Sequence, residues 1–247
     1  MRETIIVMQR EMKAYFCSPI AYVFGLLFLF IVCGVGAVFT LNPGFPADMT
    51  NWFVALPLVF LFFIPALTMR LWAEERKAGT LELLLTFPVT IPQLIAGKFL
   101  ASMSYLALLL LLTLGLPITM GSVGTLDWYP VIATYFAALL MAASYVAVGM
   151  FWSSVTRDQI IALILSVVML GLLFLVGVWG PLLIGEVPVW LGGDHVVLFI
   201  LALSPQQYFG SISRGVADTG DLVFYAAFCV FFLHATALVL YGKKVKG

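Results

Sequence analysis

Residues 159–185 read QIIALILSVVMLGLLFLVGVWGPLLIG and contain no charged side chain. A helix needs about 20 mostly apolar residues to cross the hydrocarbon core of a bilayer, and this stretch is longer than that. It therefore predicts a membrane-spanning helix.

Six more stretches lack charge, at 14–47, 49–69, 99–126, 128–156, 195–213 and 222–242. All are apolar enough to span except 195–213, where the short apolar run 196–203 is followed at once by Ser204-Pro205. We therefore expect an all-α integral membrane protein with six transmembrane helices in one domain, 1–247. The predicted spans are 20–41, 52–71, 94–120, 128–152, 160–184 and 222–241.

The composition excludes other classes of protein. The chain is 63% hydrophobic and 10% charged, with 12 acidic and 12 basic residues among 247. Soluble domains carry about 25% charged residues, so these charges cannot form a polar shell. A soluble domain, a disordered chain and a nucleic-acid binder with a basic patch are all excluded.

The signs of the charges predict the orientation, because Lys and Arg concentrate on the cytoplasmic side. With the N-terminus inside, eleven of the twelve basic residues are cytoplasmic and only Arg214 lies outside. A seventh span at 196–203 would move Lys243, Lys244 and Lys246 to the outer side. The pattern thus favours six spans with both termini in the cytoplasm.

Two segments outside the spans are amphipathic or broken. In residues 1–19, an apolar stripe of Ile5, Met8, Met12 and Phe16 predicts an interfacial helix that Ser18-Pro19 ends. The alternative is a cytosolic extension of the first span. The outer segment 185–221 is expected to hold a re-entrant or interfacial element, with Pro205 opening a helix that carries Tyr208, Phe209, Ile212 and Val216.

The region 72–93 holds the densest charge cluster. The second span is expected to run on through Glu74-Glu75-Arg76-Lys77, with Arg70–Glu74 and Glu74–Lys77 pairs at helical spacing. Gly79 predicts a helix end, Thr80 a new short helix with Glu82 in its first turn and Leu81 on its apolar side, and Thr90 a capping box.

Two interpretations of this region remain open. The short helix is either a docking element for another protein or a solvated loop with an apolar patch on the bilayer. The turn that contains Arg157 and Asp158 is either a second contact or a tight connection.

The motifs of enzymes are missing. The chain has no G-x-x-x-x-G-K-[ST] phosphate loop, no H-E-x-x-H and no G-x-S-x-G, so we expect no catalytic residue, no metal site and no ATP hydrolysis. Lys98, at the start of the third span, is expected to extend to the interface. His234, the one titratable group deep in a span, is expected to be a neutral packed side chain.

The stretch Glu74–Val89, EERKAGTLELLLTFPV, closely resembles the E-E-[KR]-x-x-G-T-[LI]-E-L-L-L-[TS]-x-P-[VI] signature of ABC-2 type transporter permeases. The N-terminal pattern of Glu11, Tyr15, Ser18-Pro19 and Tyr22 and the segment Ser211–Gly215 are similar to the same family. The resemblance is greatest to the gliding-motility and nitrous-oxide-reductase-maturation branch.

The resemblance implies the permease subunit of an ATP-driven ABC exporter in a bacterial-type cytoplasmic (inner) membrane. Its partners would be a separate ABC ATPase, which binds the ATP and Mg, and a second permease copy or a paralogous permease; the chain itself would hold no cofactor. The implied ATPase-coupling residues are Glu74, Glu75, Arg76, Lys77, Gly79, Thr80, Leu81 and Glu82, with Arg157 and Asp158 as a second contact. No substrate-binding residue is implied, and an ATP-independent channel, transporter or scaffold is the alternative.

Overall fold

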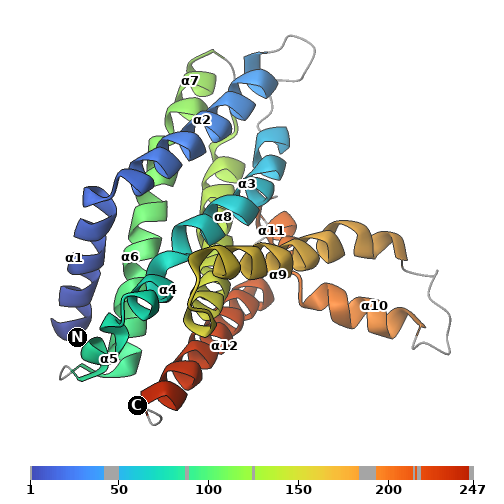
Figure 1. Cartoon of the computed structure of the whole chain (residues 1–247). Helices are drawn as coiled ribbons and strands as arrows, with labels where there is room; N and C mark the ends of the chain where they lie inside the picture. Colours follow the sequence, from blue (N-terminus) through green and yellow to red (C-terminus); the bar gives the residue numbers. More distant parts are fainter. Residues whose placement is uncertain are drawn as a thin grey trace.

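The computed structural model describes residues 2–41, 50–86, 89–123, 126–183, 193–213, 215 and 218–244, and within these residues it is all helical (Figure 1). The helices are α1 Arg2–Cys17, α2 Pro19–Leu41, α3 Thr50–Thr68, α4 Arg70–Lys77, α5 Thr80–Thr86, α6 Ile91–Leu112, α7 Gly115–Val123, α8 Trp128–Val155, α9 Gln159–Trp179, α10 Gly193–Ala202, α11 Pro205–Ser213 and α12 Thr219–Lys244.

Among the described residues, five helical stretches are long and apolar enough to cross a membrane: 55–77, 91–122, 128–155, 159–179 and 219–243. Two bent helix pairs, α1 with α2 and α10 with α11, would raise the number to seven if each were one span. A multi-pass membrane protein is thus confirmed, with five to seven spans.

The two bent pairs lie where proline breaks the predicted helices. The axes of α1 and α2 differ by 76° around Ser18-Pro19, and those of α10 and α11 differ by 72° around Ser204-Pro205. Proline lacks the N–H that would continue the preceding helix. The break expected after the short apolar run 196–203 is confirmed, and α11 packs against α8 and α9.

Two predicted spans each contain an internal turn, although each remains one continuous stretch, 55–77 and 91–122. The helix expected to run from 52–71 into Lys77 has a turn at Met69, which separates α3 from α4. The span expected at 94–120 divides at Thr113 into α6 and α7. Pro117 explains the second break, since its ring would clash with the carbonyl of Thr113, four residues earlier.

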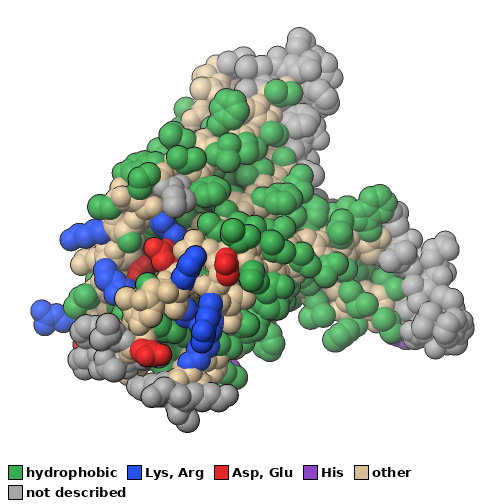
Figure 2. Space-filling view, viewed as in Figure 1, with side chains coloured by type: hydrophobic (Ala, Val, Ile, Leu, Met, Phe, Trp, Pro, Cys, Tyr) green, Lys and Arg blue, Asp and Glu red, His purple; other side chains and the backbone are tan. Residues whose placement is uncertain are grey.

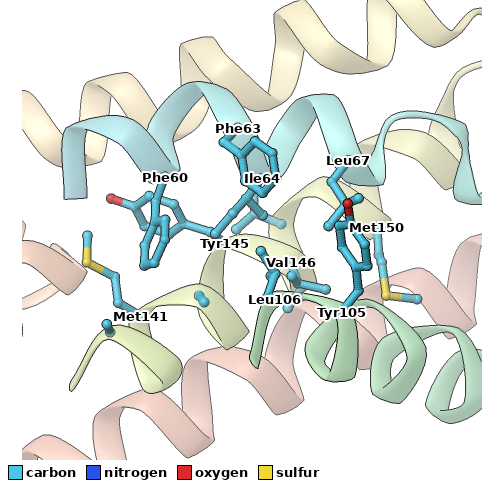
Figure 3. Packing of buried hydrophobic residues seen from close by; sticks show 14 of the residues in the cluster. Phe60, Phe63, Ile64, Leu67, Tyr105, Leu106, Met141, Tyr145, Val146 and Met150 are labelled. Atoms are coloured by element: carbon cyan, nitrogen blue, oxygen red, sulfur yellow. The ribbon is translucent and has the colours of Figure 1, made fainter. Parts of the chain in front are cut away.

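Helix α8 lies at the centre of the packing and contacts α3, α6, α9, α11 and α12. The core between α3, α6 and α8 is built from large apolar side chains (Figure 3). Its members include Phe60, Phe63, Ile64, Leu67, Tyr105, Leu106, Met141, Tyr145, Val146 and Met150. At Gly149, α3 and α8 approach so closely that a Cβ atom would lie 2.0 Å from Thr68 Oγ1.

The face of α1 that packs on the protein differs from the predicted stripe. Val7 and Tyr15 are buried against the bundle, while Ile5 and Phe16 are exposed. The helix is apolar on both sides because one side contacts α6 and the other faces outward, where an interfacial helix would meet lipid. Only Met8 and Met12 of the predicted stripe pack against the core.

Candidate functional site

Charged side chains gather at the end of the bundle where α1, α4 and α5 meet, while the sides in view are hydrophobic (Figure 2). The start of α1 and the end of α12 lie at this same end (Figure 1). Its centre is an ion cluster, which we define as Arg10, Glu11, Glu75 and Lys98. The cluster joins α1, α4 and α6, three helices that are separate in the sequence.

Lys98 is the buried member of the ion cluster, with 1% of its side chain exposed. Its Nζ lies 2.8 Å from Glu75 Oε1, 3.1 Å from Glu11 Oε1 and 2.8 Å from the carbonyl oxygen of Leu71. These three acceptors match the three donors of an ammonium group. The ammonium also lies 4.8 Å from the centre of the Trp72 ring, a cation–π contact.

The expectation that Lys98 extends to the interface was therefore wrong. The side chain does not need to reach water, because two carboxylates, a carbonyl and an aromatic ring replace its hydration within the protein. Sequence spacing could not reveal this, since Glu11 and Lys98 are 87 residues apart.

Arg10 closes the cluster on its outer side. Its guanidinium lies 2.7 Å from Glu11 Oε1 and 3.3 Å from Glu75 Oε1. Half of the Arg10 side chain is exposed, so we expect these exposed pairs to contribute little to stability. Burial opposes ionisation of Glu11, but the positive charges of Lys98 and Arg10 outweigh it and hold the pKa of Glu11 below its ordinary value of 4.5.

A carboxylate whose pKa is lowered by folding stabilises the folded state above its unfolded pKa, and that stability is lost as the pH falls through the folded pKa. Glu11→Gln is therefore expected to lower the unfolding temperature at neutral pH and to have a shrinking effect below pH 4.5. Thermal unfolding of the purified protein across this range measures it. A Glu11→Gln effect that is equal at neutral and at acidic pH would contradict the assignment.

Arg76 holds α4 against the opposite side of the bundle. Its Nη1 donates to the carbonyl oxygens of Ser154, Val155 and Thr156, at 3.1, 2.5 and 2.7 Å. These are orphan carbonyls at the C-terminal end of α8, where a cation also interacts favourably with the helix dipole. The ammonium of Lys243, from the end of α12, also donates to the carbonyl of Ser154.

At the turn between α3 and α4, the side chain of Ser153 from α8 forms hydrogen bonds with the backbone. Ser153 Oγ donates to the carbonyl of Met69 at 2.8 Å and accepts from the N–H groups of Trp72 and Ala73 at 3.0 and 3.2 Å. In a continuous helix these two N–H groups would bond to the carbonyls of Thr68 and Met69. One hydroxyl thus bonds to backbone groups of Met69, Trp72 and Ala73 around the turn.

Ser153→Ala is expected to destabilise the protein by about 1–3 kcal/mol, because it removes the hydrogen bonds that the hydroxyl makes to three backbone groups in a buried position. Ser154→Ala is the matched control. Ser154 is equally buried, but its hydroxyl donates only to Phe151 within its own helix. Unfolding of both variants in detergent measures the difference, and equal stability of the two would refute the bridging role of Ser153.

The short helix α5 follows α4 through the turn that Gly79 forms. Gly79 has φ +69°, in the left-handed region that favours glycine, so the predicted helix end is confirmed. Thr80 begins α5 and donates its hydroxyl to the carbonyl of Glu75 at 3.3 Å. The capping box at Thr90 is confirmed, with Gln93 Oε1 accepting from the Thr90 N–H at 3.0 Å.

The residues that the resemblance implied for coupling separate into internal and exposed groups. Glu75, Arg76 and Leu81 make contacts within the protein, and Asp158 caps α9 by accepting from the Ile160 N–H at 2.8 Å. The exposed members are Glu74, Lys77, Gly79, Thr80, Glu82 and Arg157. The expected Arg70–Glu74 pair is not formed, because Arg70 donates to Ser18 Oγ at 2.8 Å.

A cavity of about 540 Å³ opens beside the ion cluster, between α1 and α4. It is lined by Arg10, Glu11, Ala14, Tyr15, Cys17, Ser18, Arg70, Leu71, Glu74, Glu75, Ala78, Thr80 and Lys98. No group of three or more His, Cys, Asp or Glu side chains in the described residues is arranged to hold a metal ion. The site thus consists of exposed charged side chains and of internal polar contacts that hold the helices together.

The model of the family described as ABC-2 family transporter protein matches residues 42–243, which include α4, α5, Glu75 and Lys98. The chain belongs to this family. A comparison with curated proteins finds no match. ABC-2 family proteins are membrane components of transporters rather than enzymes, and they generally pair with an ATPase subunit. The matched range begins after α1 and α2, so the α1 half of the ion cluster lies outside it.

Sequence reasoning missed Arg10, Glu11 and Lys98 as parts of one site of this ABC-2 family protein. One signal was present: Glu11 interrupts the face of α1 between Val7 and Tyr15, which are buried on either side of it. A carboxylate on the buried face of a helix requires a partner. The signal did not identify Lys98 as that partner.

Proposed function

We propose that the chain is the permease subunit of an ATP-driven ABC exporter in a bacterial-type cytoplasmic membrane. In this proposal α2 is the first of six spans, α10 and α11 form a re-entrant outer element, and both termini are cytoplasmic. Two permease copies, identical or paralogous, would work with two separate ATPase subunits. The distribution of Lys and Arg supports the orientation.

The observation that carries the proposal is the way α4 and α5 are attached to the bundle. Helix α5 presents Glu82 to solvent and follows directly on α4. Helix α4 is tied to α1 and α6 through Glu75 and to the end of α8 through Arg76. A force applied to α5 would therefore reach three other helices through short polar contacts.

This attachment would allow a movement of α5 to be transmitted to the rest of the bundle. Closure of two ATPase subunits on ATP would bring the two α5 helices together and tilt the bundles as rigid bodies between two states. The branch of the family, the direction of transport and the coupling role of α5 are parts of this proposal. The cargo is left unassigned, since apolar side chains that line a pathway resemble those that face lipid.

Glu82→Lys is the test of docking, because Glu82 is exposed and forms no ion pair or hydrogen bond through its side chain with the described residues. In a strain that co-expresses the permease with a candidate ABC ATPase, we expect this variant to insert normally but to retain much less ATPase on purification. Lys13→Glu, a charge reversal at an exposed residue of α1, is the control. Equal retention by both variants would count against docking at α5.

The alternative, an ATP-independent channel, transporter or scaffold, makes a different prediction. Purified permease in vesicles would then conduct solute without ATP and without an ATPase subunit. Stimulation of ATPase activity by reconstituted permease, and its loss in Glu82→Lys, would support the ABC transporter instead.

A further inference from the structure

The cavity between α1 and α4 holds a guanidinium without a carboxylate partner and a buried carboxylate oxygen without a hydrogen-bond partner in the described structure. Arg70 donates to Ser18 and lies over the Tyr15 ring at 5.3 Å, but no carboxylate in the described residues is within ion-pair distance of it. Glu75 Oε2 is buried without a hydrogen-bond partner in the described residues, although Glu75 Oε1 is paired with Lys98 and Arg10. Glu74 is exposed and also lines the cavity. The cavity thus offers the guanidinium of Arg70 and the carboxylate oxygens of Glu74 and Glu75 to a ligand.

An apolar groove adjoins this cavity, and Tyr15 lines both. The groove runs between α2 and α6 and is lined by apolar and aromatic side chains. It is lined by Tyr15, Phe16, Ala21, Tyr22, Gly25, Leu26, Leu29, Tyr105, Leu109 and Leu112. From Ala21 to Leu29 the α2 side extends about 12 Å, close to the thickness of one leaflet of hydrocarbon.

The arrangement of a polar cavity and an apolar groove matches an amphipathic ligand. The cavity lies at the bend between α1 and α2, where the chain changes from an outward-facing amphipathic helix to an apolar helix. This is the level at which a phospholipid headgroup would lie. The adjoining groove would lie at the level of the acyl chains.

We propose that the cavity and the groove form one binding site for a phospholipid with an amine headgroup, such as phosphatidylethanolamine. Arg70 would bind the phosphate, since guanidinium groups match phosphate oxygens in geometry and charge. Glu74 and Glu75 Oε2 would accept from the ammonium. Arg70 and Glu74 are four residues apart on α4, about 6 Å between Cβ atoms, a spacing that fits a phosphate and an amine joined by two carbons.

The charge pattern distinguishes this ligand from other phospholipids. A phosphatidylglycerol headgroup has no amine for the carboxylates, and the quaternary ammonium of phosphatidylcholine has no N–H to donate to them. The proposal depends on the membrane location of the chain and not on coupling to an ATPase. The two ideas can therefore fail separately.

The experiment is native mass spectrometry of the full-length protein in detergent, titrated with phosphatidylethanolamine, phosphatidylglycerol and phosphatidylcholine of equal acyl length. The wild type is expected to retain phosphatidylethanolamine best. Arg70→Gln should weaken retention of every phospholipid about ten-fold, the loss of one charge-assisted hydrogen bond. Glu74→Gln should remove only the preference for phosphatidylethanolamine.

The controls are Lys13→Gln for the lost positive charge and Glu82→Gln for the lost carboxylate, both exposed and both outside the cavity lining. Unfolding temperatures show whether each variant is folded. Arg70→Lys, which keeps the charge, should retain lipid at an intermediate level. If Arg70→Gln does not fold, the exposed Glu74→Gln variant still decides the headgroup preference.

Soluble probes separate a lipid from a free anion. Glycerophosphoethanolamine and inorganic phosphate lack acyl chains, so they should compete with phosphatidylethanolamine only weakly. Competition by inorganic phosphate as strong as that by phospholipid would overturn the lipid site. The lipid site would also be overturned if the Arg70→Gln variant retained as much phospholipid as the Lys13→Gln variant. If Arg70→Gln retained phospholipid normally but lost the ATPase on purification, the cavity would instead be assigned to the protein partner.

Discussion

Lys98→Met is expected to destabilise the protein by about 3–5 kcal/mol, the cost of removing one partner from a buried ion pair. The methionine side chain fills a similar volume, so the main loss is electrostatic. Glu75 and Glu11 would face each other without the ammonium that lies 2.8 and 3.1 Å from them. The free energy of unfolding in detergent, and the yield of folded protein from membranes, measure the effect.

Two further variants make this prediction specific. Lys13→Met removes an exposed lysine from α1, and its effect should be close to zero. The double variant Lys98→Met with Glu75→Gln removes one of the opposed carboxylates, so it should be more stable than Lys98→Met alone. If Lys98→Met is as stable as Lys13→Met, the ion cluster does not hold α1, α4 and α6 together.

Gly149→Ala is expected to have the second-largest effect, because it separates α3 from α8 where Gly149 packs directly on Thr68. A Cβ atom at Gly149 would lie 2.0 Å from Thr68 Oγ1 and 2.9 Å from Thr68 Cβ, so the helices must move. Overpacking of this kind costs about 1–3 kcal/mol or more. Ser153, one turn further along α8, would also lose its bonds to Met69 and Trp72. Thermal unfolding and the retention of a co-expressed ATPase measure the two consequences.

The matched control is Gly171→Ala in α9, where a Cβ atom would meet no heavy atom within 4 Å. That variant should be neutral or stabilised by up to about 1 kcal/mol, because alanine favours helix over glycine. Adding Thr68→Ala to Gly149→Ala removes the hydroxyl that the new Cβ meets and should restore part of the stability. Equal effects of the two glycine substitutions would contradict close packing at Gly149.

The membrane class and the approximate helix positions could be predicted from the sequence, because both depend on local properties. An uncharged apolar stretch such as 159–185 must be helical in lipid, since its backbone groups have no water to bond to. Gly79, Thr90 and Pro205 acted through their own backbone geometry and were assigned correctly. The family signature at Glu74–Val89 indicated the family, which the match over residues 42–243 shows.

The breaks in the helices and the partners of the charged residues could not be predicted in this way. The turn at Met69 depends on Ser153, which is 84 residues away in the sequence. The predicted apolar stripe of α1 was partly wrong because α1 packs on α6 through Val7. Val7 lies so close to Gly97 of α6 that a Cβ atom at Gly97 would be 2.7 Å from it. Which of two apolar faces meets protein is decided by the neighbouring helix.

The sequence by itself determined that this chain lies in a membrane, where its helices begin and end to within a few residues, and which segment carries the family signature. The tertiary structure decided what that segment is attached to. Hydropathy and helix caps act over one or two turns, so they can be recognised in the sequence. The ion cluster of Arg10, Glu11, Glu75 and Lys98 forms only when α1, α4 and α6 meet, and only that meeting makes the burial of Lys98 favourable.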